Sequence, residues 1–209
     1  MAGAIEDIML EAPVIPVLVV EDAAQARPLA EALVSGGLKV LEVTLRTDCA
    51  LDVIREMKQV AGAIVGAGTV TNQDEFDAAM RAGSEFIVSP GLTESLTRIV
   101  TSHNVPFLPG VATAGDIMRG MDLGLSHFKF FPAMAAGGIP ALKALAAPFG
   151  GAKFCPTGGI TQATAPDWLA LDPVLCVGGS WLAPKGSPDY VAVAEAARNA
   201  SALKRSAGK

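Results

Sequence analysis

Short apolar runs alternate along this chain with longer stretches in which apolar residues recur at helical spacing. Each run is rich in β-branched or aromatic residues and is followed by turn residues, which is typical of a buried strand that leads into an amphipathic helix. Eight runs fit this description: residues 13–20, 39–45, 63–68, 85–89, 105–110, 127–131, 153–159 and 174–180. The chain therefore predicts eight strand-then-helix units.

Polar residues that favour helix N-termini stand before several of the intervening segments. These candidate caps are Asp22, Thr71 with Asn72, Thr93, Thr113 and Thr161. Gly36-Gly37 and Gly83 follow two of the predicted helices, at the position where glycine commonly ends a helix. Pro166 should make the helix after Thr161 short or bent, because proline lacks the N–H that a helix interior needs.

The repeated units favour a parallel sheet, because parallel neighbours need a crossover connection, usually a helix. Eight is also the number of strands that closes a (β/α)₈ TIM barrel. An open, doubly wound sheet is the alternative, but it usually carries a G-x-G-x-x-G turn where this chain has Val20-Glu21-Asp22. We therefore expect one α/β domain over residues 1–209. Its expected parts are an extra N-terminal helix in 1–12 (residues 2–10), a barrel in 13–183 and a C-terminal helix in 184–209 (roughly residues 187–204).

Composition excludes several classes of protein. Of the 209 residues, 51% are hydrophobic and 18% are charged, which excludes a disordered chain and fits a compact domain. The net charge is −5 and the chain has no run of lysine and arginine, so we expect no nucleic-acid partner.

The first residues, MAGAIEDIMLEAP, lack the pattern of a secretory signal, and the apolar runs are too short to span a membrane. Cys49, Cys155 and Cys176 are odd in number and have no C-x-x-C spacing, which predicts reduced thiols. His103 and His127 are far apart in the sequence, so we expect no metal site and no cofactor. These features predict a cytoplasmic protein.

Residues 127–131, HFKFF, place one lysine within an aromatic run. On a strand His127, Lys129 and Phe131 share one face, while Phe128 and Phe130 share the other. We expect Phe128, Phe130 and the barrel wall to remove water from around Lys129. A buried ammonium group is costly, so this lysine should be either paired with a carboxylate or held as the neutral amine.

The second predicted strand carries a polar face inside an apolar run. Val40, Glu42, Thr44 and Arg46 share one face, and this face should point into the barrel because helices cover the outside. A structural ion pair of Glu42 with Arg46 or with Lys129 is the alternative to a catalytic role.

Glycine pairs follow the last two predicted strands, as Gly158-Gly159 and Gly178-Gly179-Ser180. Glycine lets backbone N–H groups converge on an anion, and the loops after strands seven and eight commonly bind phosphate in this type of barrel. The alternative is that these glycines only make tight turns.

An enclosed lysine, a carboxylate and an arginine beside a phosphate cradle predict a phosphorylated oxo-acid substrate. Arginine can grip the carboxylate, a neutral lysine can form an imine with the ketone, and Glu42 can move protons. Together these groups predict a Schiff-base lyase. A phosphosugar isomerase or epimerase without a covalent intermediate, and a non-catalytic phosphate-binding barrel, are the alternatives.

At this point the chain resembles the 2-keto-3-deoxy-6-phosphogluconate (KDPG) and 4-hydroxy-2-oxoglutarate aldolases. The resemblance extends from residue 13 to about 183, and EVTLR, KFFPA and FCPTGG are its most specific motifs. The matching segments are VIPVLVV, GGLKVLEVTLRT, IVGAGTVTN, FIVSPGLTE, PFLPGVAT, GMDLGLSHFKFFPA, APFGGAKFCPTGGI and VLCVGGSWL.

The resemblance implies a (β/α)₈ barrel, a homotrimer, and cleavage of KDPG to pyruvate and glyceraldehyde 3-phosphate in the Entner–Doudoroff pathway. Many relatives also cleave 4-hydroxy-2-oxoglutarate, so that second activity is expected too. An aldolase for the galactonate epimer remains an alternative, because the two substrates differ at C4 and no residue in this sequence identifies the preferred configuration.

The resemblance also implies roles for individual residues, with Lys129 forming the imine and Glu42 as the proton shuttle. The other implied contacts are Arg46 and Thr69 with the pyruvate carboxylate, Pro90 and Phe131 as walls of the pyruvate pocket, Thr157 with the substrate, and Gly158, Gly159, Gly179 and Ser180 with the phosphate. The chain departs from its relatives at Ala114, Gly115 and Asp116, where a Pro or Ser before a Glu is common. This departure concerns the cap of the following helix, not the chemistry.

Overall fold

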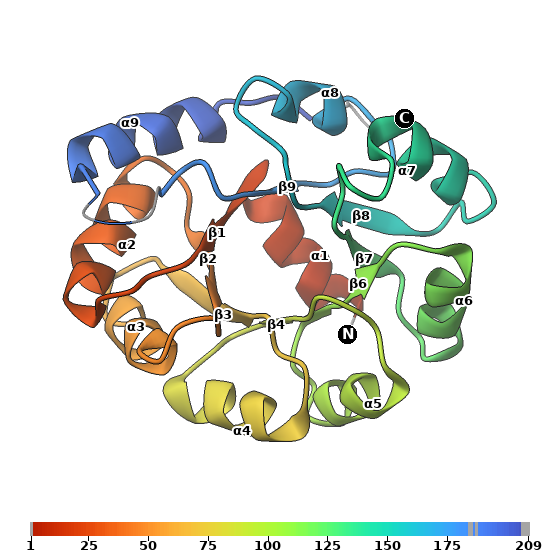
Figure 1. Ribbon diagram of the computed structural model, residues 1–209, viewed down its shortest axis with the longest axis horizontal. Helices are drawn as coiled ribbons and strands as arrows, with labels where there is room; N and C mark the ends of the chain where they lie inside the picture. The colour runs from red at the N-terminus through yellow and green to blue at the C-terminus, as the bar shows by residue number, and fades with distance from the viewer. Residues whose placement is uncertain (1, 184–185, 187, 206–209) are drawn as a thin grey trace.

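The computed structural model describes residues 2–183, 186 and 188–205, which form an α/β fold of parallel strands and surrounding helices (Figure 1). The strands are β1 Val14–Leu18, β2 Val40–Thr44, β3 Ile64–Gly68, β4 Ile87–Val88, β5 Phe107–Leu108, β6 Gly110–Val111, β7 His127–Phe130, β8 Lys153–Pro156 and β9 Val177–Gly179. The helices are α1 Ala2–Glu11, the 3₁₀ turn η1 Ala23–Gln25, α2 Ala26–Ser35, α3 Ala50–Met57, α4 Gln73–Ala82, α5 Glu94–Ser102, α6 Ala114–Asp122, α7 Gly138–Ala146, α8 Ala165–Leu169 and α9 Tyr190–Ser201.

The strands form two parallel sheets, one with the order β5-β4-β3-β2-β1-β9 and one with the order β6-β7-β8. The expected fifth strand is divided at Pro109 into β5 and β6, which belong to different sheets. Between β8 and β9 the described residues make only isolated bridges, one of them from Thr157 to Gly178. Each break has a proline, Pro109 or Pro156, whose missing N–H interrupts a strand ladder. The predicted parallel α/β fold is confirmed, whereas a single closed eight-stranded sheet is not shown.

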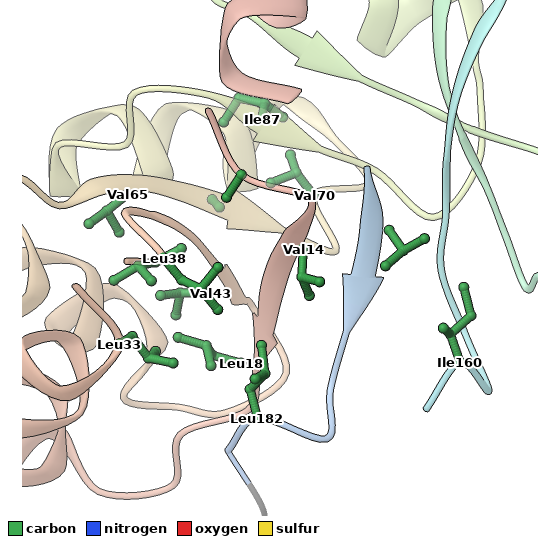
Figure 2. Close-up of a cluster of buried hydrophobic side chains, with 14 of the residues drawn as sticks. Val14, Leu18, Leu33, Leu38, Val43, Val65, Val70, Ile87, Ile160 and Leu182 are labelled. Carbon is green, nitrogen blue, oxygen red and sulfur yellow. The ribbon is translucent and has the colours of Figure 1, made fainter. Parts of the chain in front are cut away.

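The two faces of the strands pack into different hydrophobic clusters. The outer cluster lies between strands and helices and includes Val14, Leu18 and Val43 (Figure 2). The inner cluster joins the opposite strand faces to α1, and its buried members are Ile5, Met9, Ile15, Val40, Phe86, Val88, Leu108, Cys155 and Cys176. Burial of a full aliphatic or aromatic side chain contributes about 1.5–3 kcal/mol, so both clusters hold the strands in place.

Helix α1 crosses the middle of the ring of helices (Figure 1). Its last turn is tied to the C-terminal part of the chain, because the Arg205 guanidinium donates to the carbonyl oxygens of Leu10 at 2.9 Å and Leu175 at 2.6 Å. Glu11 also pairs with Lys39 at 2.8 Å, just before β2. Helix α1 therefore covers the N-terminal ends of the strands, which leaves the C-terminal ends for a ligand site.

Most predicted helix caps are confirmed. The side chains of Asp22, Asn72 and Thr93 accept backbone N–H groups at the starts of η1, α4 and α5. Gly83 ends α4 in the left-handed conformation, with φ of 98°. Local sequence was sufficient here, because a cap involves residues within one turn.

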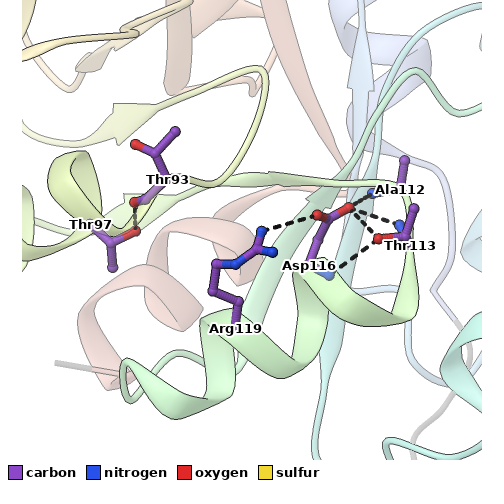
Figure 3. Close-up of polar contacts among 6 residues, drawn as sticks. All are labelled: Thr93, Thr97, Ala112, Thr113, Asp116 and Arg119. Carbon is purple, nitrogen blue, oxygen red and sulfur yellow. Dashed lines mark hydrogen bonds and ion pairs between the residues drawn. The ribbon is translucent and has the colours of Figure 1, made fainter.

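The cap of α6, which the sequence at Ala114–Asp116 leaves in doubt, is a capping box. Thr113 Oγ1 accepts the Asp116 N–H, and Asp116 Oδ2 accepts the N–H groups of Ala112 and Thr113, while Arg119 approaches the same carboxylate (Figure 3). Burial raises the pKa of Asp116, but the hydrogen bonds outweigh it and bring the pKa below its usual value. Helix α6 is therefore well capped by Thr113 and Asp116.

Two of the expected helices lack a cap, and the helix that contains Pro166 is short, as predicted. Helices α3 and α7, which follow β2 and β7, have no side-chain cap, because Cys49 and Gly137 stand at their N-cap positions. Helix α8 begins at Ala165 rather than directly after Thr161, since Pro166 is tolerated only in a first helical turn. The final helix covers Tyr190–Ser201, and position 187 of the predicted range lies outside the described residues.

None of the described helices is long and apolar enough to cross a membrane.

His127 shares the inner face of β7 and is 6% exposed. Its Nε2 atom has no hydrogen-bond partner among the described residues, and the Glu6 carboxylate lies 3.9 Å away. Burial lowers the pKa of His127; the Glu6 carboxylate opposes this shift and Lys153 adds to it. The imidazole is therefore held neutral where an exposed histidine would begin to be protonated.

We expect stability to fall as the pH drops through about 6.5, because the unfolded chain then binds a proton at this histidine that the folded chain does not. The slope for one proton is at most about 1.4 kcal/mol per pH unit. Urea unfolding between pH 8 and pH 5.5 should show a shallower profile for His127→Gln, while His103→Gln serves as the control. A His127→Gln profile as steep as that of the native protein would contradict this expectation.

Candidate active site

A buried ion pair joins two strands that are far apart in the sequence. Lys129 Nζ on β7 donates to Glu42 Oε1 on β2 at 2.9 Å, and the two residues are 5% and 3% exposed. Desolvation of two charges offsets much of their attraction, so a buried pair is weak support for stability. A carboxylate within hydrogen-bond distance of a lysine is also placed to exchange a proton with it during catalysis.

The wall around Lys129 differs in part from the prediction. Phe128 and Phe130 belong to the outer cluster, on the opposite face of β7, so they do not surround the amine. The aromatic neighbour is Phe131, whose ring centroid lies 5.4 Å from Lys129 Nζ. Cys155, which is beside Lys129 in register on β8, belongs to the inner cluster beneath. Lys129 is therefore enclosed as predicted, but by the residues of its own face.

The polar face of β2 ends before Arg46. Thr44 continues the buried face and donates to the Leu18 carbonyl oxygen at 2.8 Å. Arg46 lies beyond the last residue of the strand and is exposed, with no ion-pair partner among the described residues. Of the two alternative pairs for Glu42, the structure contains the one with Lys129. The Arg46 guanidinium is thus left to interact with a ligand or with solvent.

Thr69 follows β3 in a strained conformation. Its φ is 63°, in the left-handed region, which is unusual for a β-branched residue and costs about 1–3 kcal/mol. Gly68, the residue before it, lies against the Glu42 carboxylate. Strain of this kind is typical of ligand sites. The backbone conformation of Thr69 therefore fits the ligand contact that the sequence implies for this residue.

Pro90 and Thr157 lie on loops that contact the neighbours of Lys129. The Pro90 carbonyl packs on Gly110, which is beside Lys129 in register. Thr157 is buried directly after β8, and its N–H donates to the Phe130 carbonyl oxygen at 2.9 Å. Both residues therefore lie at the same end of the strands as Lys129.

The Gly158-Gly159 turn follows Thr157, with φ values of 105° and 77° that favour glycine. A Cβ on Gly158 would contact Phe131, so the turn lies beside the aromatic neighbour of Lys129. The N–H groups of these two glycines donate to no acceptor among the described residues. Two neighbouring backbone N–H groups without an acceptor can both donate to a bound anion.

The second predicted glycine loop is partly strand. Gly178 and Gly179 belong to β9, and only Ser180 follows it and is exposed. Gly178 bridges to Thr157, so this strand end lies next to the first glycine turn. The two segments that the sequence proposed for phosphate are therefore neighbours in space.

No three His, Cys, Asp or Glu side chains in the described ranges are grouped to hold a metal ion. The three cysteines are free, and Cys155 and Cys176 are buried. Burial raises the pKa of Cys176, and a hydrogen bond with Cys155 acts in the same direction, so this group remains a thiol.

Nothing in the sequence singles out Gly68 or Gly110, and the sequence places Gly178 in a phosphate loop rather than in a strand. Each is a position where an added Cβ would lie within 2.4 Å of a site residue, namely Glu42, Pro90 or Thr157. Glycine inside a strand often marks a close approach of another group, and this was the available signal.

Comparison with known proteins places the chain among aldolases. The family model described as "KDPG and KHG aldolase" matches residues 5–196. The KHG/KDPG aldolase of Escherichia coli K12 is 51% identical over 199 residues, with 93% of each chain covered.

Two solved structures match nearly the whole fold. The 2-keto-3-deoxy-6-phosphogluconate aldolase of Zymomonas mobilis ZM4, solved with 3-phosphoglycerate, is 55% identical with a TM-score of 0.98 and full coverage of both chains. The KDPG aldolase of Legionella pneumophila, solved with pyruvate as a covalent carbinolamine intermediate, is 41% identical with a TM-score of 0.91, covering 95% of this chain and 98% of that one.

Proposed function

This chain belongs to the KDPG and KHG aldolase family, and from that premise we propose that it cleaves KDPG to pyruvate and D-glyceraldehyde 3-phosphate through a Schiff base on Lys129. The observation that carries the proposal is the enclosed contact of 2.9 Å between Lys129 Nζ and Glu42 Oε1. A lysine that attacks a carbonyl must first lose a proton, and a carboxylate within hydrogen-bond reach can accept it. The covalent pyruvate intermediate in the Legionella pneumophila relative supports the same chemistry.

Imine formation begins when the Lys129 ammonium passes a proton to Glu42. The neutral amine then attacks C2 of KDPG, a C–N bond forms, and the carbonyl oxygen takes a proton from the attacking nitrogen to become a hydroxyl group. Glu42 returns a proton to that hydroxyl group, which leaves as water, and a protonated imine remains. Because Glu42 is the carboxylate next to the amine, one group can serve both steps as base and acid.

Cleavage uses the protonated imine as an electron sink. Glu42, directly or through a water, takes the proton of the C4 hydroxyl group. The C3–C4 bond breaks, C4 becomes the aldehyde carbon of glyceraldehyde 3-phosphate, and the electron pair forms the C2=C3 bond of an enamine. Protonation at C3 and addition of water at C2 release pyruvate and restore the amine.

Substrate binding is proposed from the positions of the remaining residues. The unpaired Arg46 and the strained Thr69 hold the pyruvate carboxylate, since arginine suits a two-pronged contact with a carboxylate. Pro90 and Phe131 form the walls of the pyruvate pocket, and Thr157 contacts the substrate. These groups lie on strand ends or loops around the Lys129–Glu42 pair.

The phosphate group is proposed to bind at the Gly158-Gly159 turn and at Gly179 and Ser180 after the adjacent strand. The support is the pair of N–H groups on the turn and the bridge from Thr157 to Gly178, which brings the two segments together. The Zymomonas mobilis relative was solved with 3-phosphoglycerate, a phosphorylated acid of similar chemistry.

Several finer properties are part of the same proposal. The two sheets together would make a (β/α)₈ barrel, with β5 and β6 as one interrupted strand and the bridges after β8 as the closing seam. The chain would be one domain, cytoplasmic, and assembled as a homotrimer. A second activity, cleavage of 4-hydroxy-2-oxoglutarate to pyruvate and glyoxylate, is supported by the name of the Escherichia coli relative.

The proposal is tested by incubation with pyruvate and sodium borohydride, followed by mass spectrometry and peptide mapping. Reduction should trap a secondary amine, with a mass gain of one pyruvic acid less one oxygen atom, on the peptide that contains Lys129. An isomerase, an epimerase or a binding protein would show no adduct. Parallel assays with KDPG and its galactonate epimer determine which C4 configuration is cleaved.

A further inference from the structure

We propose that Gly68 is a positioning residue for the proton-transfer step, because its bare Cα leaves the space in which the Glu42 carboxylate meets Lys129. The inference rests on the proposed function, since it concerns the same lysine and carboxylate. It assigns a role to a strand glycine that contacts neither substrate nor cofactor.

The close approach follows from the register of two adjacent strands. Glu42 on β2 is beside Gly66 on β3, and Thr44 is beside Gly68. The Glu42 side chain extends along the strand direction and lies over Gly68, two residues further on. A Cβ at position 68 would lie 2.3 Å from Glu42 Oε1, 2.8 Å from Cγ and 2.9 Å from Cδ.

The atom most affected is the one that accepts the hydrogen bond. Glu42 Oε1 accepts a hydrogen bond from Lys129 Nζ at 2.9 Å, and the same oxygen would be displaced by a methyl group at position 68. Contacts below 3.0 Å essentially never occur for a real Cβ, so this oxygen has to move. The space over Gly68 is thus occupied by the reacting end of Glu42.

Glu42 has few alternative positions for its carboxylate. The equivalent space over Gly66 is filled by the Phe86 ring, whose carbons lie 2.5 Å from where a Cβ would be. Phe86 and Val40 belong to the apolar inner cluster beneath the pair. Movement in that direction would bury a carboxylate without a hydrogen-bond partner, which is costly. The carboxylate is therefore confined to the position over Gly68.

The backbone conformation at position 68 does not require a glycine. Gly68 lies within β3 and its φ is outside the left-handed region, unlike that of Gly83 or Gly158. Alanine could adopt the same backbone, and the atoms that it would meet belong to one flexible side chain. Gly68→Ala should therefore fold, while Glu42 turns away from Lys129.

The experiment compares the native protein with Gly68→Ala, Glu42→Gln and the double variant. Displacement of a catalytic group by about 1 Å can cost about 100-fold, so kcat for KDPG cleavage should fall by about that factor in Gly68→Ala, with KM nearly unchanged. In the Glu42→Gln background the added Gly68→Ala substitution should cost less than about 3-fold, because the acid–base function is already lost. Equal losses in both backgrounds would mean a general distortion and would overturn the proposal.

Gly151→Ala is the matched control, since a Cβ there meets nothing within 4 Å and its φ is not positive. It should retain native kcat and native stability. A Gly68→Ala protein with native kcat overturns this inference alone, provided that the native protein traps pyruvate with borohydride. If the native protein traps no pyruvate, the proposed function itself fails.

The free energy of unfolding provides a second measurement. If Gly68→Ala proves unstable, the substitution must cause no further loss of stability in the Glu42→Ala background, where the side chain that it meets is absent. A similar loss in that background would show that the space at position 68 serves the backbone or another neighbour, and the proposal would be wrong.

Discussion

Replacement of Lys129 by alanine is expected to reduce KDPG cleavage to less than about one ten-thousandth of the native rate, the scale seen when a covalent nucleophile is removed. The nitrogen of the Lys129 amine is the atom that becomes bonded to the substrate in the proposed mechanism. Among the described residues, Lys129 is the only buried lysine. The measurement is a coupled assay of pyruvate release together with borohydride trapping. Both signals should disappear.

In Lys129→Ala, a loss of activity caused by the missing amine has to be distinguished from a loss caused by unfolding. Removal of Lys129 leaves Glu42 buried without its partner, which can destabilise a fold by about 3–5 kcal/mol. Lys129→Arg keeps a cation at this position but cannot form the imine, so it should be folded and inactive. Lys153→Ala, which removes a lysine at the start of β8, should keep the native kcat. Undiminished turnover by a folded Lys129→Ala or Lys129→Arg protein would rule out the mechanism.

Glu42→Gln is the second substitution with a large expected effect. The amide keeps the shape of the side chain but cannot accept or return a proton, so general acid–base catalysis worth about 10²- to 10⁴-fold should be lost. Because Glu42 serves both imine formation and C3–C4 cleavage, both steps should become slower. Single-turnover trapping with pyruvate measures the first step, and KDPG cleavage measures the second.

The two rates together test the assignment of Glu42. A variant that forms the pyruvate imine at the native rate but cleaves KDPG slowly would limit Glu42 to the cleavage step. Native rates in both assays would mean that another group moves the protons. Thr44→Val, next on the same face of β2, is a control because its hydroxyl donates to the Leu18 carbonyl and not to Lys129.

Much of the fold could be predicted because the relevant interactions are local. Strand and helix periods identified the strands, and the caps at Asp22, Asn72 and Thr93 depend on residues within one turn. The strand-then-helix pattern also predicts helices at α3 and α7, but no cap marks where they begin. Neither has a polar N-cap, and their stability comes from packing on the outer cluster.

The candidate site was predicted less evenly than the fold. Alternation correctly separated Lys129 from Phe128 and Phe130, but the same rule carried Arg46 onto the buried face of β2 although the strand ends at Thr44. Strand ends are set by where the pairing with neighbours stops, and this is not visible in a single run of residues.

The sequence by itself determined the side-chain alternation that encloses Lys129, the parallel α/β class, and the turns and caps, because each depends on residues close together along the chain. Tertiary structure alone decided that Glu42, 87 residues away, is the partner of Lys129. It also decided that Gly68 makes room for their contact. Those relations depend on strand register and on space between side chains, which form only when distant segments pack together.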